Sequence, residues 1–477
     1  MTAELSWQAE EVMRTVQGQC LHEQSWHARN VAIDSRAAKP GDLFVALKGP
    51  AHDAHDFVGD AFAKGAMAAI VSRKPAQAPK EAPLIFVEDT FAALEALGQA
   101  GRARAQGKIL AVTGSVGKTG TKEMLRLMLN ACGDAYANEG SFNNQWGVPL
   151  SLARLPAEAH FGVFELGMNH AGELALLAPQ VRPDVALITT IEAVHMEFFP
   201  SVEAIAAAKA EIFIGMKPDG VAVLNRDNPH FARLAEGARA QGIRRILGFG
   251  SEGRADGKLL SYAGSPQGGM VEAEILGKKL AYPLGAAGAH LALNSVGALL
   301  AATAAGADAE TCAAALAQYR PPVGRGTVSV IHLDDGEVTL IDESYNASPA
   351  AVRAALKVLG TMTPSPGGRR VFALGDMREL GAATDGLHAD LAPDVIEAGV
   401  DLFYGCGAAA VHLYEALPGE KRGFHTRTSA DLAQRLAADL RPGDIVAVKG
   451  SHSMKMEAVV EAIKALGRAT KSQKMAS

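Results

Sequence analysis

The segment Ile109–Thr121, which reads ILAVTGSVGKTGT, decides the fold of the middle of the chain. Its apolar first half is typical of a buried β-strand, and the KEMLRLMLNA that follows has apolar residues at helical spacing. The glycine-containing turn between them therefore joins a strand to the N-terminus of a helix. Backbone N–H groups and the positive end of the helix dipole meet at such a turn, and both favour a bound phosphate.

This turn is shorter than the general phosphate-binding pattern, which has four residues between its first glycine and its Gly-Lys pair. Only two residues intervene here. The lysine after the pair can reach the β- and γ-phosphates of a nucleotide, and the next threonine hydroxyl can bind Mg²⁺. A glycine turn beside a surface lysine is the alternative, although strand, loop and helix are in register for phosphate. The expected nucleotide-binding residues are Gly114, Ser115, Val116, Gly117, Lys118 and Thr119.

Composition argues against two classes of partner. The 477 residues carry a net charge of −6 with acids and bases interspersed, so there is no basic stripe for a nucleic acid. No uncharged apolar run reaches the roughly 18 residues that cross a membrane, and the N-terminal MTAELSWQAEEV does not resemble a secretory signal. The four cysteines form no closely spaced motif, which suits a reducing compartment. We expect a cytoplasmic monomer that binds neither nucleic acid nor membrane.

Alternation of apolar strands with helical segments predicts an α/β fold with parallel sheets. At roughly 150 residues per domain, the length suggests about three domains. The polar end of FAALEALGQAGRARAQG marks one boundary, and the proline- and glycine-rich YRPPVGRG marks the other. A Gly-rich, strand-like stretch is expected between residues 250 and 288, followed by a helix near Ala289. The predicted domains are a small N-terminal α/β unit, a central P-loop ATPase-like unit and a C-terminal Rossmann-like unit, at residues 1–103, 104–320 and 321–477.

Three polar residues downstream of the loop could separate a switch, a kinase and a ligase, and one of them is a candidate for metal binding. Glu165 ends the predicted strand in FGVFELG, at the sheet edge where ligands gather, and its carboxylate could join Thr119 on one Mg²⁺. His195 follows the next strand at the same edge, although a lone histidine is more often structural. Lys209 lies in the alanine-rich helical segment VEAIAAAKAEIF, and taken singly it is an ordinary exposed lysine.

Other polar residues could meet the nucleotide from farther along the chain. His290 and Asn294 are spaced i and i+4, so they share one helix face, and the asparagine amide could pair with an adenine edge. Exposed polar residues on a boundary helix are an equally good reading of this pair. Residues at the start of the third region could close a cleft over the nucleotide: Arg325, Asp342 and Asn346.

Taken together, the motifs give the chain a family likeness. In order it contains AVTGSVGKTGTKE, NEGSFNNQWGVPLSLARL, FELGMNHAGE, AVHMEFF, AKAEIF, HLALNSVGALLA, PVGRG, DESYNASPAAV and LGDMRELG. This series resembles the Mur ligases, ATP-dependent enzymes that build the peptide of peptidoglycan precursors. The resemblance runs from AIDSRAAKPGDLFVALKG almost to the C-terminus. DESYNASPAAV and ALGDMRELG look like the family members that join D-alanyl-D-alanine to UDP-N-acetylmuramoyl-tripeptide, through an acyl phosphate and with release of ADP and phosphate.

The resemblance implies roles for individual residues. Lys118 and the loop amides would hold ATP, while Thr119 and Glu165 would hold one Mg²⁺ and His195 would help to hold a second. Lys209 matches a lysine that is carbamoylated in the family, which turns a cation into an anionic metal ligand. The first domain would bind the UDP-muramoyl-peptide, the second ATP and the third the dipeptide.

The remaining roles follow from matching positions. Nucleotide contacts would come from His290, Asn294, Arg325, Asp342 and Asn346. The UDP end of the substrate would be bound by Ser35, Arg36 and Lys48. The muramoyl-peptide would face Asn143 and Asn144. The dipeptide would be bound by Lys449 and Ser451, although His452 stands where the family usually has arginine.

Several functions remain open from the sequence. A sibling ligase that adds the third residue of the peptide would show a histidine after the tyrosine of DESYNASP, which this chain lacks. A folylpolyglutamate synthetase would share the loop and the lysine chemistry but not the N-terminal unit. A non-catalytic nucleotide switch needs the loop but gains nothing from two metals and a carbamate.

Overall fold

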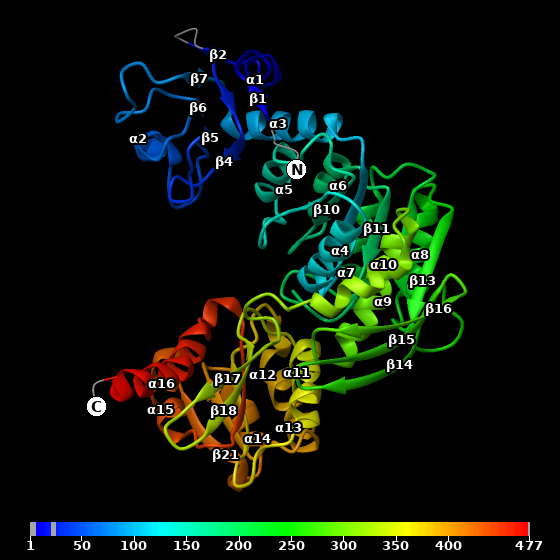
Figure 1. Ribbon diagram of the computed structural model, residues 1–477, viewed down its shortest axis with the longest axis vertical. Coiled ribbons are helices and arrows are strands. Elements are labelled where there is room, and N and C mark those ends of the chain that lie inside the picture. Colours follow the sequence, from blue (N-terminus) through cyan, green and yellow to red (C-terminus); the bar gives the residue numbers. More distant parts are fainter. Residues whose placement is uncertain (1–5, 21–24, 476–477) are drawn as a thin grey trace.

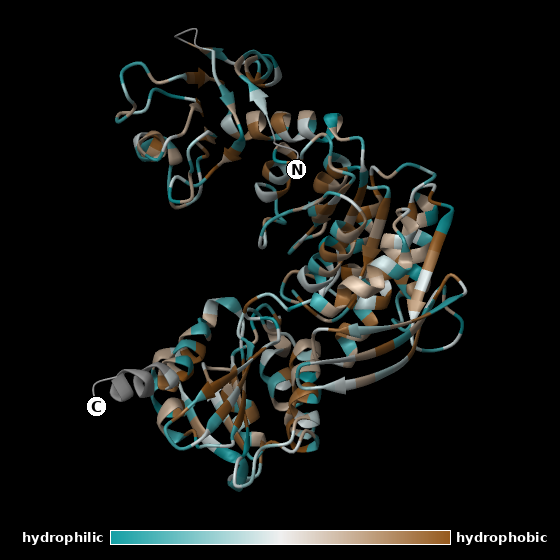
Figure 2. Ribbon diagram, viewed as in Figure 1, coloured by the Kyte–Doolittle hydropathy of each residue, from teal (hydrophilic) through white to brown (hydrophobic). Residues whose placement is uncertain are grey.

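A computed structural model describes residues 6–20 and 25–475. Three large sheets with their helices follow one another along the molecule, from the N-terminal part through the central part to the C-terminal part (Figure 1), and a two-stranded antiparallel sheet lies in the N-terminal part. Hydrophobic residues concentrate on the strands inside these layers, and hydrophilic residues on the outer loops and helix faces (Figure 2). No helix in the described ranges is long and apolar enough to cross a membrane.

The N-terminal sheet is mostly parallel. Its order is β2 (Gln19–Cys20), β7 (Leu84–Phe86), β6 (Ala68–Val71), β5 (Asp42–Val45) and β4 (Asn30–Ala32), with β2 antiparallel to its neighbour. β5 and β6 are buried throughout, as strands covered on both faces must be. The surrounding elements are β1 (Trp7–Gln8), α1 (Ala9–Val16), β3 (His27–Ala28), a 3₁₀ turn (Ala54–Phe57), α2 (Val58–Ala63) and α3 (Thr90–Arg104).

The central sheet places β8 (Lys108–Thr113), the strand before the glycine loop, among parallel neighbours. The strand order is β16 (Lys278–Leu284), β15 (Gly268–Ile275), β14 (Gly257–Ser265), β13 (Arg245–Gly250), β12 (Val221–Asn225), β11 (Val185–Ile188), β8, β10 (Phe161–Glu165) and β9 (Ala135–Ala137). Strands β14 to β16 pair antiparallel, so the expected Gly-rich stretch extends the sheet. The following helix begins at Ala289, as predicted from the sequence.

Helices cover both faces of the central sheet. One core joins the sheet to α4 (Lys118–Cys132), α9 (Ala289–Ala304) and α10 (Ala309–Ala315). The opposite core joins it to α5 (Gly147–Ala153), α6 (Glu173–Val181), α7 (Val202–Ala210) and α8 (Phe231–Ala240). Loops from β8, β10 and β11 therefore open at one edge of a sheet that is fixed from both sides.

The C-terminal sheet repeats this layered arrangement. Its order is β17 (Thr327–His332), β18 (Glu337–Glu343), β22 (Ile445–Lys449), β19 (Arg370–Gly375), β20 (Leu402–Cys406) and β21 (Arg422–Thr426), with β17 antiparallel. One face packs on α11 (Pro349–Thr361), α13 (Ala392–Glu397) and α14 (Ala410–Ala416), beside α12 (Thr384–Ala389). The other packs on α15 (Ser429–Asp439) and α16 (Glu457–Met475). The predicted α/β class with parallel sheets is confirmed.

Close backbone contact joins the N-terminal part to the central part. Helix α3 lies against α5, and glycines one turn apart on α3 face α5 backbone atoms. A Cβ atom added at Gly98 would lie 2.8 Å from the Pro149 carbonyl oxygen, and one at Gly101 would lie 2.2 Å from the Leu152 carbonyl oxygen. Only glycine permits this separation of the two helices.

We therefore expect Gly101→Ala to destabilise the protein, by about 1–3 kcal/mol as for other overpacked sites. Gly386→Ala is the matched control, because it lies within α12 and an added Cβ there meets nothing within 4 Å. The control should be neutral or slightly stabilising, since alanine favours a helix over glycine. Thermal and urea unfolding of both variants provides the measurement. Equal unfolding midpoints for the two variants would show that the α3–α5 contact can relax.

Candidate functional site

The glycine loop lies between the end of β8 and the start of α4, with its open side toward α9. Gly117 has a φ of 85°, and a Cβ atom there would come within 2.7 Å of Nδ2 of Asn294. The Asn294 side chain, which is on the first turns of α9, is therefore packed against the loop. Lys118 curls back and donates hydrogen bonds to the carbonyl oxygens of Gly114 at 2.7 Å and Ser115 at 3.4 Å. The loop thus brings its lysine and an amide side chain to one place.

Positive charges gather around this loop. Burial lowers the pKa of the Lys118 ammonium, and the nearby Arg325 guanidinium lowers it further. The Glu165 carboxylate opposes both effects, so it also lies close to the lysine. Arg325 comes from the start of the C-terminal part, and its guanidinium carbon stacks 3.9 Å from the ring centre of Tyr345. Two parts of the molecule therefore contribute charge to the loop.

Two buried oxygens at the loop have no hydrogen-bond partner among the described residues. Thr119 is 4% exposed and Glu165 is 1% exposed. Glu165 Oε1 accepts a hydrogen bond from Nδ2 of Asn143 at 2.8 Å. Within the described ranges, neither Glu165 Oε2 nor Thr119 Oγ1 has a hydrogen-bond partner. A hydroxyl and a carboxylate oxygen left unpaired in this way are suited to a hard cation such as Mg²⁺.

Lys209 is buried on α7, a helix that begins where the Ser201 hydroxyl accepts from the N–H of Ala204. The interpretation of Lys209 as an exposed surface lysine is wrong, because the residue is only 1% exposed. Its pKa is well below the ordinary value of 10.5, first because of burial and then because of the charge on Lys118. No acidic side chain of the described residues forms an ion pair with it. Such a lysine favours the neutral, nucleophilic amine.

His195 lies in the loop after β11 and has a φ of 56°, a left-handed conformation that is uncommon outside glycine. Its Nδ1 lies 2.5 Å from Oε2 of Glu379, a residue of the C-terminal part. Burial lowers the pKa of the His195 imidazole, Glu379 raises it, and the charges of Lys118 and Lys209 lower it. His195 therefore belongs to the same electrostatic cluster as the two lysines.

The described residues contain no group of three histidine, cysteine, aspartate or glutamate side chains that could hold a metal. The candidate metal set instead combines Thr119, Glu165, His195 and Lys209. It would gain an oxygen donor if the lysine carried a carboxylate. This mixture of a hydroxyl, a carboxylate and an imidazole fits a cation that keeps several waters, as Mg²⁺ does.

Other expected nucleotide residues are placed differently. Burial and the nearby Lys449 lower the pKa of the His290 imidazole, while Glu343 raises it. Lys449 Nζ donates to Oε2 of Glu343 at 2.9 Å in a largely buried pair. His290 therefore faces the C-terminal sheet. The carboxylate of Asp342 accepts from the N–H and the hydroxyl of Ser344, at 3.1 and 2.6 Å.

The remaining expected residues have mainly local partners. Ser451 Oγ accepts from the N–H of Arg378, and the exposed Asn346 accepts from the N–H of Ala347. Asn144 accepts from the first N–H groups of α5, unlike its neighbour Asn143, which contacts Glu165. In the N-terminal part, the Ser35 and Arg36 carbonyls both accept from Lys64, the Arg36 side chain pairs with Asp34, and the exposed Lys48 forms a backbone bridge to Asp53. No contact between these N-terminal residues and the glycine loop is present in the described part of the chain.

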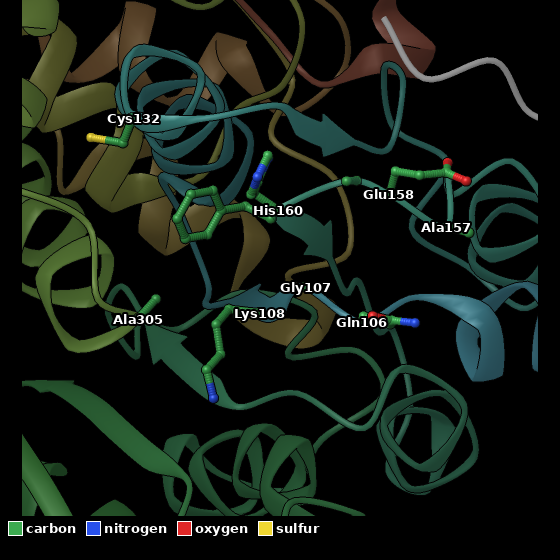
Figure 3. A pocket seen from close by; sticks show the side chains of 10 residues that line it. Gln106, Gly107, Lys108, Cys132, Ala157, Glu158, His160 and Ala305 are labelled. Carbon is green, nitrogen blue, oxygen red and sulfur yellow. The ribbon is translucent and has the colours of Figure 1, made fainter.

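A cavity of about 540 Å³ lies far from this cluster in the topology. It is lined by residues at the beginnings of β8 and β10 and at the end of α4, so it opens at the sheet edge opposite the loop. Figure 3 shows Lys108, His160, Glu158 and Cys132 around it. Because parallel α/β sheets bind ligands at the carboxyl ends of their strands, the loop edge is the candidate site.

Comparisons with known proteins agree with this arrangement of parts. Three family models match in order: "Mur ligase family, catalytic domain" at residues 27–102, "Mur ligase middle domain" at 112–302 and "Mur ligase, glutamate ligase domain" at 324–452. The UDP-N-acetylmuramoyl-tripeptide–D-alanyl-D-alanine ligase of Rickettsia prowazekii is 33% identical over 437 residues, which cover 92% of this chain and 95% of that protein. This chain belongs to the Mur ligase family.

Solved structures of the Mur ligase family show the same architecture. A crystal structure of MurF from Acinetobacter baumannii is 31% identical, with a TM-score of 0.83 over 97% of this chain and all of that one. The MurF ligase of Thermotoga maritima, solved in complex with ADP, is 27% identical, with a TM-score of 0.76 over 93% of this chain and 98% of that one. The similarity extends over all three sheets.

Sequence reasoning missed three residues of this Mur ligase site. Glu379 contacts His195, Glu343 pairs with Lys449, and the hydroxyl of Tyr345 lies 2.6 Å from that of Ser141. All three come from the C-terminal part. They lie inside the quoted segments LGDMRELG and DESYNASPAAV, so the motifs gave the signal, but no spacing rule shows which of their side chains cross to the central part.

The buried Lys209 leads to a pH-dependent prediction. Its pKa is depressed in the folded state, so the unfolded chain binds more protons below 10.5 and stability rises with pH toward that value. In CO₂-free buffer, Lys209→Met should therefore be more stable than the wild type near pH 7. The difference should shrink as the pH rises toward 10.5. Thermal unfolding from pH 7 to 10.5 is the measurement, and a difference that grows with pH would contradict the assignment.

Proposed function

We propose that this chain is an ATP-dependent ligase that joins D-alanyl-D-alanine to UDP-N-acetylmuramoyl-tripeptide and releases ADP and phosphate. The observation that carries the proposal is a pair of buried oxygens, on Thr119 and Glu165, that no described residue hydrogen-bonds. They lie beside a phosphate loop and a buried lysine that has no acidic partner in the described ranges. The R. prowazekii relative is named for this reaction, and the T. maritima structure holds ADP.

In this proposal the nucleotide is held between the central and C-terminal parts. The loop N–H groups and Lys118 bind the phosphates, once Lys118 exchanges its carbonyl partners for phosphate oxygens. Asn294 lies against the loop and Arg325 acts on Lys118, which supports roles for both in nucleotide binding. His290, Asp342 and Asn346 are proposed as further nucleotide contacts.

Two Mg²⁺ ions complete the proposed site. Thr119 and Glu165 would hold one, and His195 would help to hold the other. Lys209 would take part as a carbamate: its neutral amine attacks CO₂, a C–N bond forms as one C=O π bond opens, and a proton leaves the nitrogen. The product is a carboxylate whose single negative charge is shared by two oxygens. The depressed pKa of Lys209 supports this step, because only the neutral amine reacts. When bound, the cations neutralise charge between the phosphate and the attacking carboxylate.

The chain's own residues then control the reaction. A carboxylate approaching a γ-phosphate brings two anions together, and the charges of Lys118 and Arg325, which lie close enough to affect each other, would offset that repulsion. The carboxylate oxygen attacks phosphorus, the bond to ADP breaks, and an acyl phosphate forms. The dipeptide amine then attacks the acyl carbon, loses a proton and expels phosphate. Contacts between the central and C-terminal parts, such as Ser141 with Tyr345, would help to exclude water.

Substrate binding is proposed for all three parts. Ser35, Arg36 and Lys48 would bind the UDP end, Asn143 and Asn144 the muramoyl-peptide, and Lys449 and Ser451 the dipeptide. The three sheets lie within residues 19–86, 108–284 and 327–449, which supports a division into domains 1–103, 104–320 and 321–477. A cytoplasmic location and a monomeric state stay predictions.

The direct test measures ADP release from purified protein with ATP, Mg²⁺ and UDP-N-acetylmuramoyl-tripeptide. Adding D-alanyl-D-alanine should raise the rate and yield the pentapeptide, seen by mass spectrometry. The sibling ligase, which adds the third residue, is tested by replacing the tripeptide substrate with UDP-N-acetylmuramoyl-dipeptide and D-alanyl-D-alanine with an amino acid. A nucleotide switch would release ADP at a rate that depends neither on the UDP-muramoyl-peptide nor on D-alanyl-D-alanine, and that result would refute the proposal.

The carbamate has its own test. Lys209→Ala should abolish ligation, and short carboxylates such as formate or acetate should restore part of it by supplying the missing oxygen donors. Lys217→Ala, which removes an exposed lysine from the loop between α7 and β12, is the matched control and should retain wild-type turnover. Rates are measured by ADP release at several carboxylate concentrations. Wild-type turnover in Lys209→Ala would argue against the carbamate.

A further inference from the structure

Glu379 reaches from the C-terminal part to a histidine of the central part. Its Oε2 lies 2.5 Å from Nδ1 of His195, across 184 residues of sequence. The His195 side chain is 18% exposed and that of Glu379 is 42% exposed, so the pair lies at the margin of the buried cluster. An exposed ion pair usually contributes little to stability, which makes stability alone a weak reason for this contact.

The backbone around the pair is built for the contact. His195 and Glu379 both have left-handed backbones, with φ of 56° and 63°. Such conformations cost of order 1–3 kcal/mol and tend to persist where function requires them. The N–H of Glu197 donates to the carbonyl oxygen of Glu379 at 3.1 Å, and the Cβ position of Gly381 lies 3.4 Å from the Cα of Glu197. Two strained loops therefore dock through backbone as well as side chain.

The chemistry of the pair fixes the histidine's protonation pattern. A carboxylate only accepts hydrogen bonds, so the proton between the two groups belongs to Nδ1 of His195. In the neutral imidazole the lone pair then lies on Nε2, the other ring nitrogen. Carboxylate partners hold metal-binding histidines in this way, and their loss typically weakens metal binding about 10- to 100-fold.

We propose that Glu379 is a positioning residue through which the C-terminal part presents Nε2 of His195 to a divalent cation at the glycine loop. Docking of the two loops thereby couples cation binding to the arrangement of the central and C-terminal parts. This inference rests on the proposed role of His195 in metal binding. It adds a residue that touches neither substrate nor cation and acts only through the imidazole.

The test measures Mn²⁺ affinity in the presence of a non-hydrolysable ATP analogue, by electron paramagnetic resonance of free Mn²⁺. Glu379→Ala should weaken Mn²⁺ binding about tenfold or more. Glu379→Gln should restore most of it, because its amide oxygen can accept the same hydrogen bond. Glu197→Ala is the matched control, since it removes a carboxylate from the docked loops but keeps the backbone N–H. Its Mn²⁺ affinity should equal that of the wild type.

A double-mutant cycle separates this inference from the proposed function. His195→Ala should weaken Mn²⁺ binding, and adding Glu379→Ala to it should have no further effect. If His195→Ala weakens binding but Glu379→Ala does not, only the positioning role is overturned. The positioning role is also overturned if Glu379→Gln binds Mn²⁺ as weakly as Glu379→Ala does. It is overturned as well if Glu197→Ala lowers the Mn²⁺ affinity as much as Glu379→Ala does. If His195→Ala leaves Mn²⁺ affinity unchanged, the metal role in the proposed function is wrong and the inference is overturned with it, whatever the ligation assay shows.

Discussion

The burial of Lys209, with no acidic partner among the residues that the structure describes, is the constraint around which the loop edge of the central sheet is organised. For a lysine that is 1% exposed and near the charge of Lys118, keeping the amine protonated costs free energy. The alanine-rich helix α7 nonetheless buries this side chain, close enough to the glycine loop for the charge on Lys118 to lower its pKa. The arrangement is reasonable only if the amine is neutral or becomes an anion, and either state makes the lysine a partner for cations rather than for phosphate.

Neighbouring polar groups are also buried without hydrogen-bond partners among the described residues. Thr119 Oγ1 and Glu165 Oε2 are buried without hydrogen bonds from any described residue, and each such group costs about 1–3 kcal/mol relative to a satisfied one. Lys118 meanwhile satisfies itself with the carbonyl oxygens of its own loop. These features are typical of a binding site that its ligands complete. The hydrogen bond from Asn143 holds one oxygen of Glu165 and leaves the other directed elsewhere, so the carboxylate is oriented before any ligand arrives.

Much of this could be predicted from the sequence, and the rest could not for definite reasons. The loop and the strand-ending Glu165 follow local rules, because a strand, a turn and a helix fix where their ends lie. The burial of Lys209 does not follow such a rule. Helix α7 has alanines on every side, so no apolar face shows which side of the helix turns toward the core. The pairing of His195 with Glu379 depends on how two sheets are placed, which no spacing within either segment encodes. The sequence patterns did not predict β9, which has only three residues, or β21, whose five residues RGFHT are mostly polar and only partly buried.

The contacts between the central and C-terminal parts meet at the loop edge of the central sheet. Arg325 stacks on Tyr345, whose hydroxyl meets Ser141, a near neighbour in sequence of the Asn143 that orients Glu165. Glu379 meets His195 on the loop after β11, which follows β8 in the sheet. The C-terminal part therefore contacts the loop edge from both sides of Lys118, through charged and aromatic side chains rather than through an apolar core. Such an interface is weak on its own and sensitive to charge, so binding an anionic nucleotide and its cations changes the balance that holds the two parts together.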